Sequence, residues 1–377
     1  MIPAVRVTST KSDRLWNNTR AFQNRVHALK LFMVGALLLG APLSVSADEK
    51  PIQIGVLALG PRPVPAWHCG SDDPLASATP RPETVPPAVL GLRDGLIRLN
   101  YVEDRPENAG MPGRRFALDI RMGTVQDIRA YAREFVRKRV DMIVAIATAP
   151  VRITQEETQD SSIPILMTSV SDPVREGFAL SLARPAGFIT GVGHQMAQEN
   201  GKRVELFKQL MPALERLITI RRPGYRPSEE SVQEVRAVAR ELKVDLIDLK
   251  VTSREELQTV LAKMPWRSGD GIMVLTDTFI ISNVDLVLET SLEHRVPAFG
   301  LQDYMADWGA LAAYGPSAYE SGAHDARYVD KISKGAKPGD LAIEPIDPTF
   351  VVSLKAAKCL GISPPLEVLR QADRIIR

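Results

Sequence analysis

The chain has 377 residues, which is long for one ordinary domain and fits two domains of about 150 residues each. Hydrophobic residues make up 45% of the chain and charged residues 24%, a composition that fits a folded globular protein and argues against an intrinsically disordered one. The first 47 residues carry six of the 47 basic side chains and one of the 45 acidic side chains. The remaining 41 basic and 44 acidic residues give a formal charge of −3, which argues against a nucleic-acid-binding protein.

Residues 1–47 are predicted to form a cleavable signal peptide. The basic residues end at Lys30, an uncharged and mainly apolar stretch follows at 31–43, and Val45-Ser46-Ala47 supplies small residues for signal peptidase. This apolar stretch is too short for a membrane anchor, which needs about 20 residues. The alternative interpretation is a buried core helix. We therefore expect export to the periplasm.

Beyond the signal peptide, short aliphatic runs alternate with amphipathic stretches of helical period. Strands are predicted at 52–59, 116–121, 142–147, 163–170, 216–221, 244–249, 271–276 and 350–354. Helices are predicted at 89–99, around 128–135, and at 198–210, 228–242, 253–263, 281–294 and 319–334. This alternation is typical of parallel sheets with helices on both faces. The number of strands favours an α/β protein with two Rossmann-like lobes.

One segment, 60–87, interrupts this pattern with closely spaced prolines. Proline lacks a backbone N–H and fixes its φ angle, so the segment is expected to form a long ordered loop or flap. The two cysteines, Cys69 and Cys359, are too few for a disulfide framework.

Hydroxyl and carboxyl side chains follow three of the predicted strands. The three motifs are Thr148-Ala149-Pro150, Ser171-Asp172-Pro173 and Thr276-Asp277-Thr278. Ligands of open α/β sheets bind at the carboxyl ends of strands, where helix N-termini offer backbone N–H groups. The motifs are therefore candidate ligand contacts. The alternative is that each only caps the helix that follows it.

Recognised catalytic motifs are scarce in the sequence. There is no G-x-S-x-G, H-E-x-x-H or P-loop motif, and Gly191-Val192-Gly193 lacks the third glycine of a dinucleotide-binding fingerprint. We therefore expect a protein without catalytic activity, cofactor or metal site. An exported enzyme that uses Asp172 or Asp303 as acid or base is the competing hypothesis.

Several segments resemble a family of ABC-transporter substrate-binding proteins whose better-known members bind aromatic amino acids. The resemblance runs colinearly from about residue 52 to the end of the chain. Its segments are GLRDGL (91–96), LNYVE (99–103), VDMIV (140–144), SVSDPV (169–174), LARPAGFITG (182–191), GKRVEL (201–206), AYGP (313–316) and YVDKISKGAKP (328–338).

The resemblance implies the class I periplasmic-binding fold, in which two Rossmann-like lobes with parallel sheets are joined by a three-segment hinge. We place the crossovers near residues 190, 314 and 344. The first lobe is then 48–190 plus 315–344, and the second lobe is 191–314 plus 345–377. The expected protein is a monomer that delivers a small molecule to the membrane permease of an ABC transporter and binds no nucleic acid. A sensory ligand-binding protein would use the same fold.

The same resemblance implies a ligand held between the lobes. The candidate contacts are Leu59, Thr148, Ala149, Ser171, Asp172, Thr276, Asp277 and Tyr304. Hydroxyls and the N–H groups of helix N-termini would donate hydrogen bonds to a ligand carboxylate, and Asp172 or Asp277 would pair with a ligand ammonium. The expected ligand is therefore an amino acid or a related carboxylate. Two features depart from the family pattern: the proline-rich segment 60–87 replaces a shorter loop, and Trp308 and Ala310 stand where small residues and a glycine pair are usual.

Overall fold

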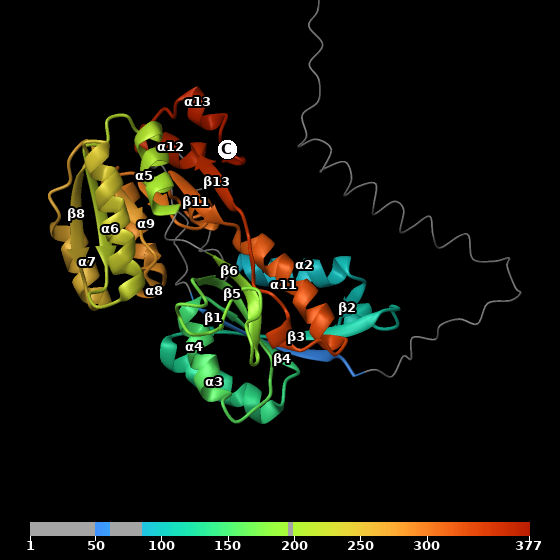
Figure 1. Cartoon of the computed structure of the whole chain (residues 1–377). Coiled ribbons are helices and arrows are strands. Elements are labelled where there is room, and N and C mark those ends of the chain that lie inside the picture. Colours follow the sequence, from blue (N-terminus) through green and yellow to red (C-terminus); the bar gives the residue numbers. More distant parts are fainter. Residues whose placement is uncertain (1–49, 61–84, 195–198) are drawn as a thin grey trace, which may run out of the picture. The chain divides into compact units, whose positions relative to one another are not determined.

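The computed structural model describes residues 50–60, 85–194 and 199–377 (Figure 1). The predicted signal peptide lies outside the described residues, and so does most of the proline-rich segment with Cys69. None of the helices in the described ranges is long and apolar enough to span a membrane.

The first sheet has seven strands in the order β12-β6-β5-β4-β1-β3-β2. Its strands are β1 (Ile52–Leu59), β2 (Tyr101–Glu103), β3 (Arg114–Gly123), β4 (Met142–Ile146), β5 (Ile165–Ser171), β6 (Ile189–His194) and β12 (Glu344–Pro345). All neighbouring strands of this sheet are parallel. The order β3-β1-β4-β5-β6 within it is that of a doubly wound fold, which brings the carboxyl ends of β1, β4 and β5 to one edge.

The second sheet has the order β14-β13-β11-β10-β9-β7-β8, in which β8-β7-β9-β10-β11 repeats the doubly wound order of the first sheet. Its strands are β7 (Arg216–Arg221), β8 (Asp245–Lys250), β9 (Asp270–Val274), β10 (Ala298–Gly300), β11 (Ala312–Pro316), β13 (Pro348–Ser353) and β14 (Arg374–Ile376). Only the pairing of β11 with β13 is antiparallel among the described strands. Both sheets are therefore mostly parallel.

Helices cover both faces of each sheet. Those of the first sheet are α2 (Pro87–Arg98), α3 (Val125–Lys138), α4 (Thr148–Glu157) and α11 (Ala318–Ser333). Those of the second are α5 (Glu199–Leu210), α6 (Arg226–Glu241), α7 (Arg254–Lys263), α8 (Thr278–Ile281), α9 (Val284–Glu293), α10 (Tyr304–Asp307), α12 (Leu354–Leu360) and α13 (Leu366–Leu369). Short 3₁₀ helices are η2 (Pro106–Asn108) and η4 (Pro338–Asp340).

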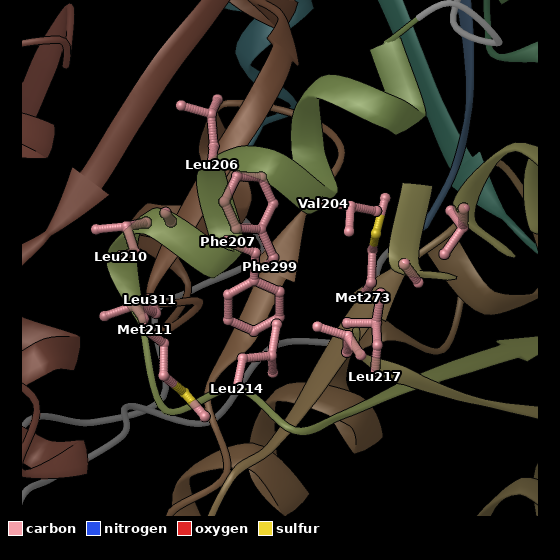
Figure 2. Packing of buried hydrophobic residues seen from close by; sticks show 14 of the residues in the cluster. Val204, Leu206, Phe207, Leu210, Met211, Leu214, Leu217, Met273, Phe299 and Leu311 are labelled. Carbon is pink, nitrogen blue, oxygen red and sulfur yellow. The ribbon is translucent and has the colours of Figure 1, made fainter. Parts of the chain in front are cut away.

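The core of the second sheet shows how strand alternation separates its two faces. Neighbouring residues of β7 join different clusters: Leu217 packs with Phe207 and Phe299 beside α5 and α6, whereas Ile218 packs with Leu257 on α7. The rings of Phe207 and Phe299 lie 5.3 Å apart between centroids (Figure 2). Because both faces of the sheet are buried, the central strands have nearly continuous apolar sequences.

Glycines allow α2 and α11 to pack very closely on the first sheet. A Cβ atom at Gly322 would lie 1.7 Å from the carbonyl oxygen of Ala88, and one at Gly91 would lie 1.9 Å from that of Tyr319. The two helices run side by side in Figure 1. This contact fixes the start of α2, where Ala88 lies.

The chain passes between the two sheets three times. It does so between β6 and α5, between β11 and α11, and between β12 and β13. The predicted lobe boundaries remain a prediction. Near the first two passages, the side chain of Arg203 on α5 is fully buried and forms an ion pair with Glu199, 2.6 Å from nitrogen to oxygen.

Candidate functional site

Residues that follow strands of both sheets line a pocket. It contains about 970 Å³ of space, part of it open to solvent. From the first sheet and its helices it is lined by Ala58, Leu59, Pro86, Pro87, Ala88, Ile146, Ala147, Thr148, Ser169 and Ala318. From the second it is lined by Tyr225, Thr276, Thr278, Ile281, Ser282, Leu301, Gln302, Tyr304 and Trp308. The pocket thus occupies the edge at which α/β sheets bind ligands.

The first turn of α4 contributes backbone donors to this pocket. Ala147 precedes the helix with φ 77° and ψ 161°, and no side chain caps the helix start. Backbone N–H groups at a helix start have no intrahelical acceptor and carry partial positive charge. The conformation of Ala147 is one that glycine usually adopts, at a cost of about 1–3 kcal/mol for other residues. The backbone is therefore strained at Ala147, directly before the helix start whose N–H groups can bind an anion.

A β-bulge turns Ser169 toward the pocket. The pairing of β5 with β6 shifts register between Met167 and Val170, and Ser169 adopts φ 58°. The hydroxyl of its neighbour Thr168 donates a hydrogen bond to the carboxyl of Asp325 on α11. The Ser169 hydroxyl, in contrast, is buried and has no partner within the described structure. Ser169 lines the pocket, and its hydroxyl is a hydrogen-bond donor and acceptor that no group of the described structure satisfies.

Thr276 provides a second hydroxyl of this kind from the opposite sheet. It follows β9, lines the pocket, and its Oγ1 is buried without a partner among the described residues. Leaving a buried polar group without a hydrogen bond costs about 1–3 kcal/mol. Ser169 and Thr276 are each 9% exposed, so a polar ligand that reaches both can satisfy groups that the fold leaves unsatisfied.

Aromatic side chains form much of the second sheet's part of the wall. The rings of Tyr304 and Trp308 lie 4.5 Å apart between centroids at an interplanar angle of 58°. Tyr225 Oη lies 3.1 Å from Thr278 Oγ1. Burial raises the pKa of the Tyr225 and Tyr304 phenols, so both hydroxyls stay protonated at neutral pH. Such rings suit the apolar or aromatic body of a ligand.

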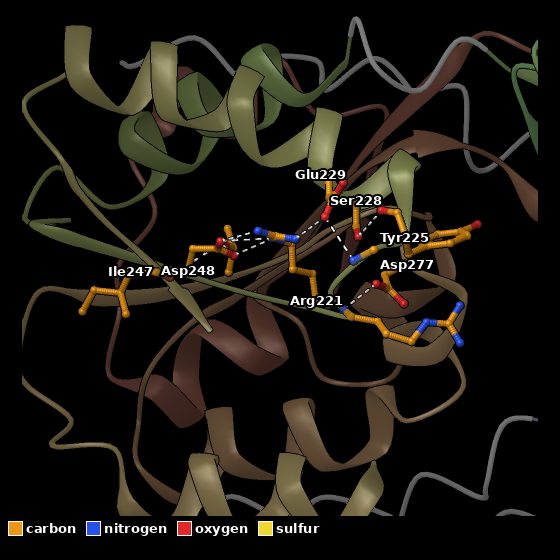
Figure 3. A network of polar contacts seen from close by, with 10 residues as sticks. Arg221, Tyr225, Ser228, Glu229, Ile247, Asp248 and Asp277 are labelled. Carbon is orange, nitrogen blue, oxygen red and sulfur yellow. Dashed lines mark hydrogen bonds and ion pairs between the residues drawn. The ribbon is translucent and has the colours of Figure 1, made fainter. Parts of the chain in front are cut away.

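A polar network holds the loop that carries Tyr225 (Figure 3). Glu229 accepts a hydrogen bond from the backbone N–H of Gly224 at 3.0 Å, and Asp277 accepts one from that of Arg222 at 2.8 Å. The Ser228 hydroxyl donates to the carbonyl oxygen of Tyr225 at 2.9 Å. These hydrogen bonds hold both ends of the loop between β7 and α6. They thereby position the ring of Tyr225 on the pocket wall.

The structure places the sequence-predicted contacts in two groups. Leu59, Thr148, Thr276 and Tyr304 line the pocket. The described lining does not include Ala149, Ser171, Asp172 or Asp277.

The carboxylates of Asp172 and Asp277 are engaged in local backbone contacts. Asp172 is exposed and accepts a hydrogen bond from the N–H of Arg175 at 3.2 Å. Asp277 is fully buried, precedes α8, and accepts from the N–H groups of Phe279 and Ile280. For Asp277 the structure therefore shows the helix-cap role that was the alternative to ligand binding. Thr148, by contrast, is the first residue of α4 and does not cap it.

Several lining residues were not among the predicted contacts, notably Ser169, Tyr225, Gln302 and Trp308. Tyr225 follows the predicted strand 216–221. The rule that ligands bind at the carboxyl ends of strands therefore also points to Tyr225. Gln302 follows β10, whose three residues are too few for a periodic pattern. A bulge such as the one at Ser169 leaves no signal in a single sequence. In the described ranges, no group of three or more His, Cys, Asp or Glu side chains could hold a metal ion.

Comparison with known proteins gives a consistent result. Residues 115–376 match the model of the family described as ABC transporter substrate binding protein. A curated relative, the tyrosine-binding protein of Clostridioides difficile (strain R20291), is 26% identical over 231 residues, which are 61% of this chain and 65% of the relative. The chain thus spans a little under two thirds of the length of that relative.

Solved structures share the fold. An ABC domain from Streptococcus pneumonia in complex with L-Trp has a TM-score of 0.66 at 23% identity, over 87% of this chain and 100% of that one. A conserved domain protein from Vibrio cholerae has a TM-score of 0.64 at 23% identity, over 86% and 100% of the two chains. The predicted two-lobed α/β periplasmic-binding fold is confirmed. Since the family model matches more than half of the sequence, this chain belongs to the ABC transporter substrate-binding protein family.

Proposed function

We propose that this protein is an exported substrate-binding component that captures a small carboxylate, an amino acid or a related acid, in the pocket between its two sheets. In this proposal residues 1–47 direct export to the periplasm, and the protein acts as a monomer that delivers its ligand to the permease of an ABC transporter. Membership of the family supports the transport role, and the chemistry of the pocket supports the ligand class.

The observation that carries the proposal is the pair of unpartnered hydroxyls beside an uncapped helix. Ser169 and Thr276 present buried oxygens without partners within the described structure, and the start of α4 presents backbone N–H groups to the same pocket. A carboxylate accepts several hydrogen bonds at once and is stabilised by the positive end of a helix. A carboxylate seated there would satisfy donors that the protein's own groups leave unsatisfied.

The aromatic wall supports a ligand with an apolar body. Trp308, Tyr304 and Tyr225 lie on one side of the pocket, with Leu301 and Ile281 among them. One relative is a tyrosine-binding protein, and one structure with the same fold was solved in complex with L-Trp. An aromatic carboxylate of that size therefore suits the wall of this pocket as well.

The competing enzymatic hypothesis finds little support in the carboxylates named for it. Asp172 is exposed and caps a turn. Asp303 accepts hydrogen bonds from the backbone N–H groups of Tyr304 and Ala318, at 2.9 and 3.2 Å. Neither arrangement resembles an acid or base held ready for proton transfer to a ligand.

A thermal-shift screen of the purified protein tests the proposal. The compounds are amino acids, aromatic and aliphatic carboxylates, nucleosides and sugars. A ligand at 100 times its Kd stabilises the folded state by about 2.7 kcal/mol and raises the Tm measurably. We expect hits among the carboxylates that weaken in Trp308→Ala, which alters the pocket wall, and persist in Trp266→Ala, which does not. Hits confined to sugars or nucleosides would overturn the ligand class, and chemical conversion of a hit would establish the enzyme instead.

A further inference from the structure

The turn 172–177, which follows β5 in the first sheet, is fixed to α4. The carboxylate of Asp172 accepts a hydrogen bond from the backbone N–H of Arg175 at 3.2 Å, and the N–H of Glu176 donates to the carbonyl oxygen of Asp172 at 3.0 Å. Arg152 on α4 donates to the carbonyl oxygen of Glu176 at 2.9 Å and pairs with its carboxylate. The turn therefore moves together with the helix whose start lines the pocket.

An ion pair joins this turn to the second sheet. The guanidinium of Arg175 pairs with the carboxylate of Glu230 on α6. The residue before α6 is Tyr225, whose ring lines the pocket. Burial, and to a lesser degree the negative charge of Glu176, raises the pKa of the Tyr225 phenol, so the turn lies near this part of the wall. The ion pair thus connects segments that support pocket walls from both sheets.

The ion pair lies away from the three passages of the chain between the sheets. Those passages run between β6 and α5, between β11 and α11, and between β12 and β13, and neither Arg175 nor Glu230 belongs to them. Two lobes joined by such passages open by rotating about them. A rotation that opens the pocket separates the turn 172–177 from α6 and breaks the ion pair. The pair therefore stabilises the arrangement in which the two sheets enclose the pocket.

Glu230 has a second partner on its own helix. Nε of Arg226 lies 3.2 Å from a carboxylate oxygen of Glu230, one helical turn away, and this pair persists when the sheets separate. The side chains of Arg175 and Glu230 are 49% and 35% exposed. An ion pair so exposed changes an equilibrium by about two- to five-fold, and salt screens it.

We propose that Arg175 and Glu230 form an electrostatic latch that favours the enclosed pocket and slows ligand release, although neither residue lines the pocket. Arg226 opposes the latch, because its charge already compensates Glu230 when the sheets are apart and repels Arg175 when they meet. Asp172 supports the latch by holding the backbone of Arg175. The inference rests on the proposed function, since it takes the pocket as the ligand site, but it does not depend on which ligand binds.

Stopped-flow fluorescence with L-tyrosine as the probe tests the latch. L-tyrosine has no indole, and Trp308 lines the pocket, so the tryptophan signal comes from the protein. At about 20 mM salt, Arg175→Gln and Glu230→Gln should each raise the dissociation rate about two- to five-fold and change the association rate by less than about two-fold. At about 0.5 M salt their rates should equal that of the wild type.

Variants of neighbouring charges distinguish the latch from a general charge effect. Arg226→Gln removes the same charge as Arg175→Gln beside the same carboxylate, yet it should leave the dissociation rate unchanged or lower it. The double variant Arg175→Glu/Glu230→Arg restores opposite charges and should release L-tyrosine more slowly than either of its single variants. The control Arg240→Gln lies in the exposed last turn of α6 and should have the wild-type rate. If Arg175→Gln has the wild-type dissociation rate at low salt, the latch is wrong and the proposed function stands.

Small-angle X-ray scattering tests the latch without a ligand. Arg175→Glu places two like charges opposite each other, so at low salt its radius of gyration should exceed that of the wild type, and at high salt the two values should converge. If L-tyrosine does not bind, this measurement alone decides the latch, and equal radii at low salt overturn it. The thermal-shift screen decides the proposed function separately, because it requires only that some carboxylate binds.

Discussion

Arg203 donates a hydrogen bond through Nε to the carbonyl oxygen of Tyr314 at 2.7 Å. This bond joins α5, which follows the first passage of the chain between the sheets, to β11, which precedes the second. The same guanidinium bonds Asn200 at 2.9 Å and Glu199 at 2.6 Å. One fully buried side chain therefore connects two of the three passages.

Replacing Arg203 should destabilise the protein strongly. Arg203→Met removes the charge and leaves the carboxylate of Glu199 without its partner, and breaking a buried ion pair in this way costs about 3–5 kcal/mol. Urea denaturation measures the change. The matched control is Lys202→Met on the same helix, whose ion pair with Glu205 is exposed and 3.6 Å long. It should change stability by less than about 1 kcal/mol. Equal effects of the two substitutions would contradict a connecting role for Arg203.

Removing the unpartnered hydroxyl of Thr276 should affect binding and stability in opposite directions. Thr276→Val preserves the shape of the side chain and removes an unsatisfied buried group, so the unliganded protein should be as stable as the wild type or more stable. Ligand affinity should fall by about 0.5–1.5 kcal/mol, because a hydrogen bond to the ligand is lost. Calorimetry and urea denaturation measure the two effects.

Thr290→Val provides the matched control for this prediction. The Thr290 hydroxyl donates to the carbonyl oxygen of Leu286 at 2.8 Å, on α9 and away from the pocket lining. This variant should bind ligand like the wild type. A Thr276→Val protein with reduced stability and unchanged affinity would show that the hydroxyl has a structural role instead.

Gly322→Ala should be destabilising although alanine is the better helix former. A Cβ at this position would lie 1.7 Å from the carbonyl oxygen of Ala88, so α2 and α11 must separate. Overpacking of this kind costs about 1–3 kcal/mol. Because Ala88 lines the pocket, we also expect weaker ligand binding. Gly201→Ala on α5, whose Cβ would lie 3.2 Å from a methyl carbon of Val238 and would meet no backbone atom of another element, should cost much less than Gly322→Ala.

The free energy of unfolding should decrease at acid pH because of His194. Burial lowers the pKa of this histidine to about 3, and the positive charge of Arg203 adds to the effect. The unfolded chain takes up the proton near pH 6.5, whereas the folded protein does so only near pH 3. The contribution of the neutral ring to stability is therefore complete above pH 6.5 and is lost as the pH falls from 6.5 toward 3.

His194→Leu should reduce this loss. At about 1.36 kcal/mol per pKa unit, the wild type should lose about 2 kcal/mol through His194 between pH 7 and pH 5, and the variant should be spared that amount. Urea denaturation at the two pH values measures the difference. His294→Leu, at an exposed position, should retain the wild-type fall. Parallel pH profiles of wild type and His194→Leu would exclude the buried histidine as the cause.

Much of the fold could be predicted because long buried strands and amphipathic helices leave periodic patterns. The predicted strands 52–59 and 216–221 coincide with β1 and β7. The predictions do not include β6, β10 and β11, nor the two- and three-residue strands β2, β12 and β14. β10 has only three residues, and β6 and β11 contain glycines that interrupt an aliphatic run. Their places follow from packing in the sheet rather than from local pattern.

The pocket was less predictable than the fold. The residues that follow predicted strands include Thr148 and Thr276, and both line the pocket because the carboxyl ends of parallel strands share an edge. The same rule cannot tell a carboxylate that faces a ligand from one that caps a helix, as Asp277 does. Tyr304 and Trp308 reach the wall through a single short helix, α10, whose orientation depends on tertiary contacts.

The bulge in β5 gives two adjacent residues separate tasks. Thr168 is directed to Asp325 in the interior, whereas Ser169 is directed to the pocket. Evolution can therefore change the residue at 169, and with it ligand preference, without disturbing the interior contact made one position earlier. Paralogues that diverge in ligand should vary at position 169 while they keep the pair formed by positions 168 and 325.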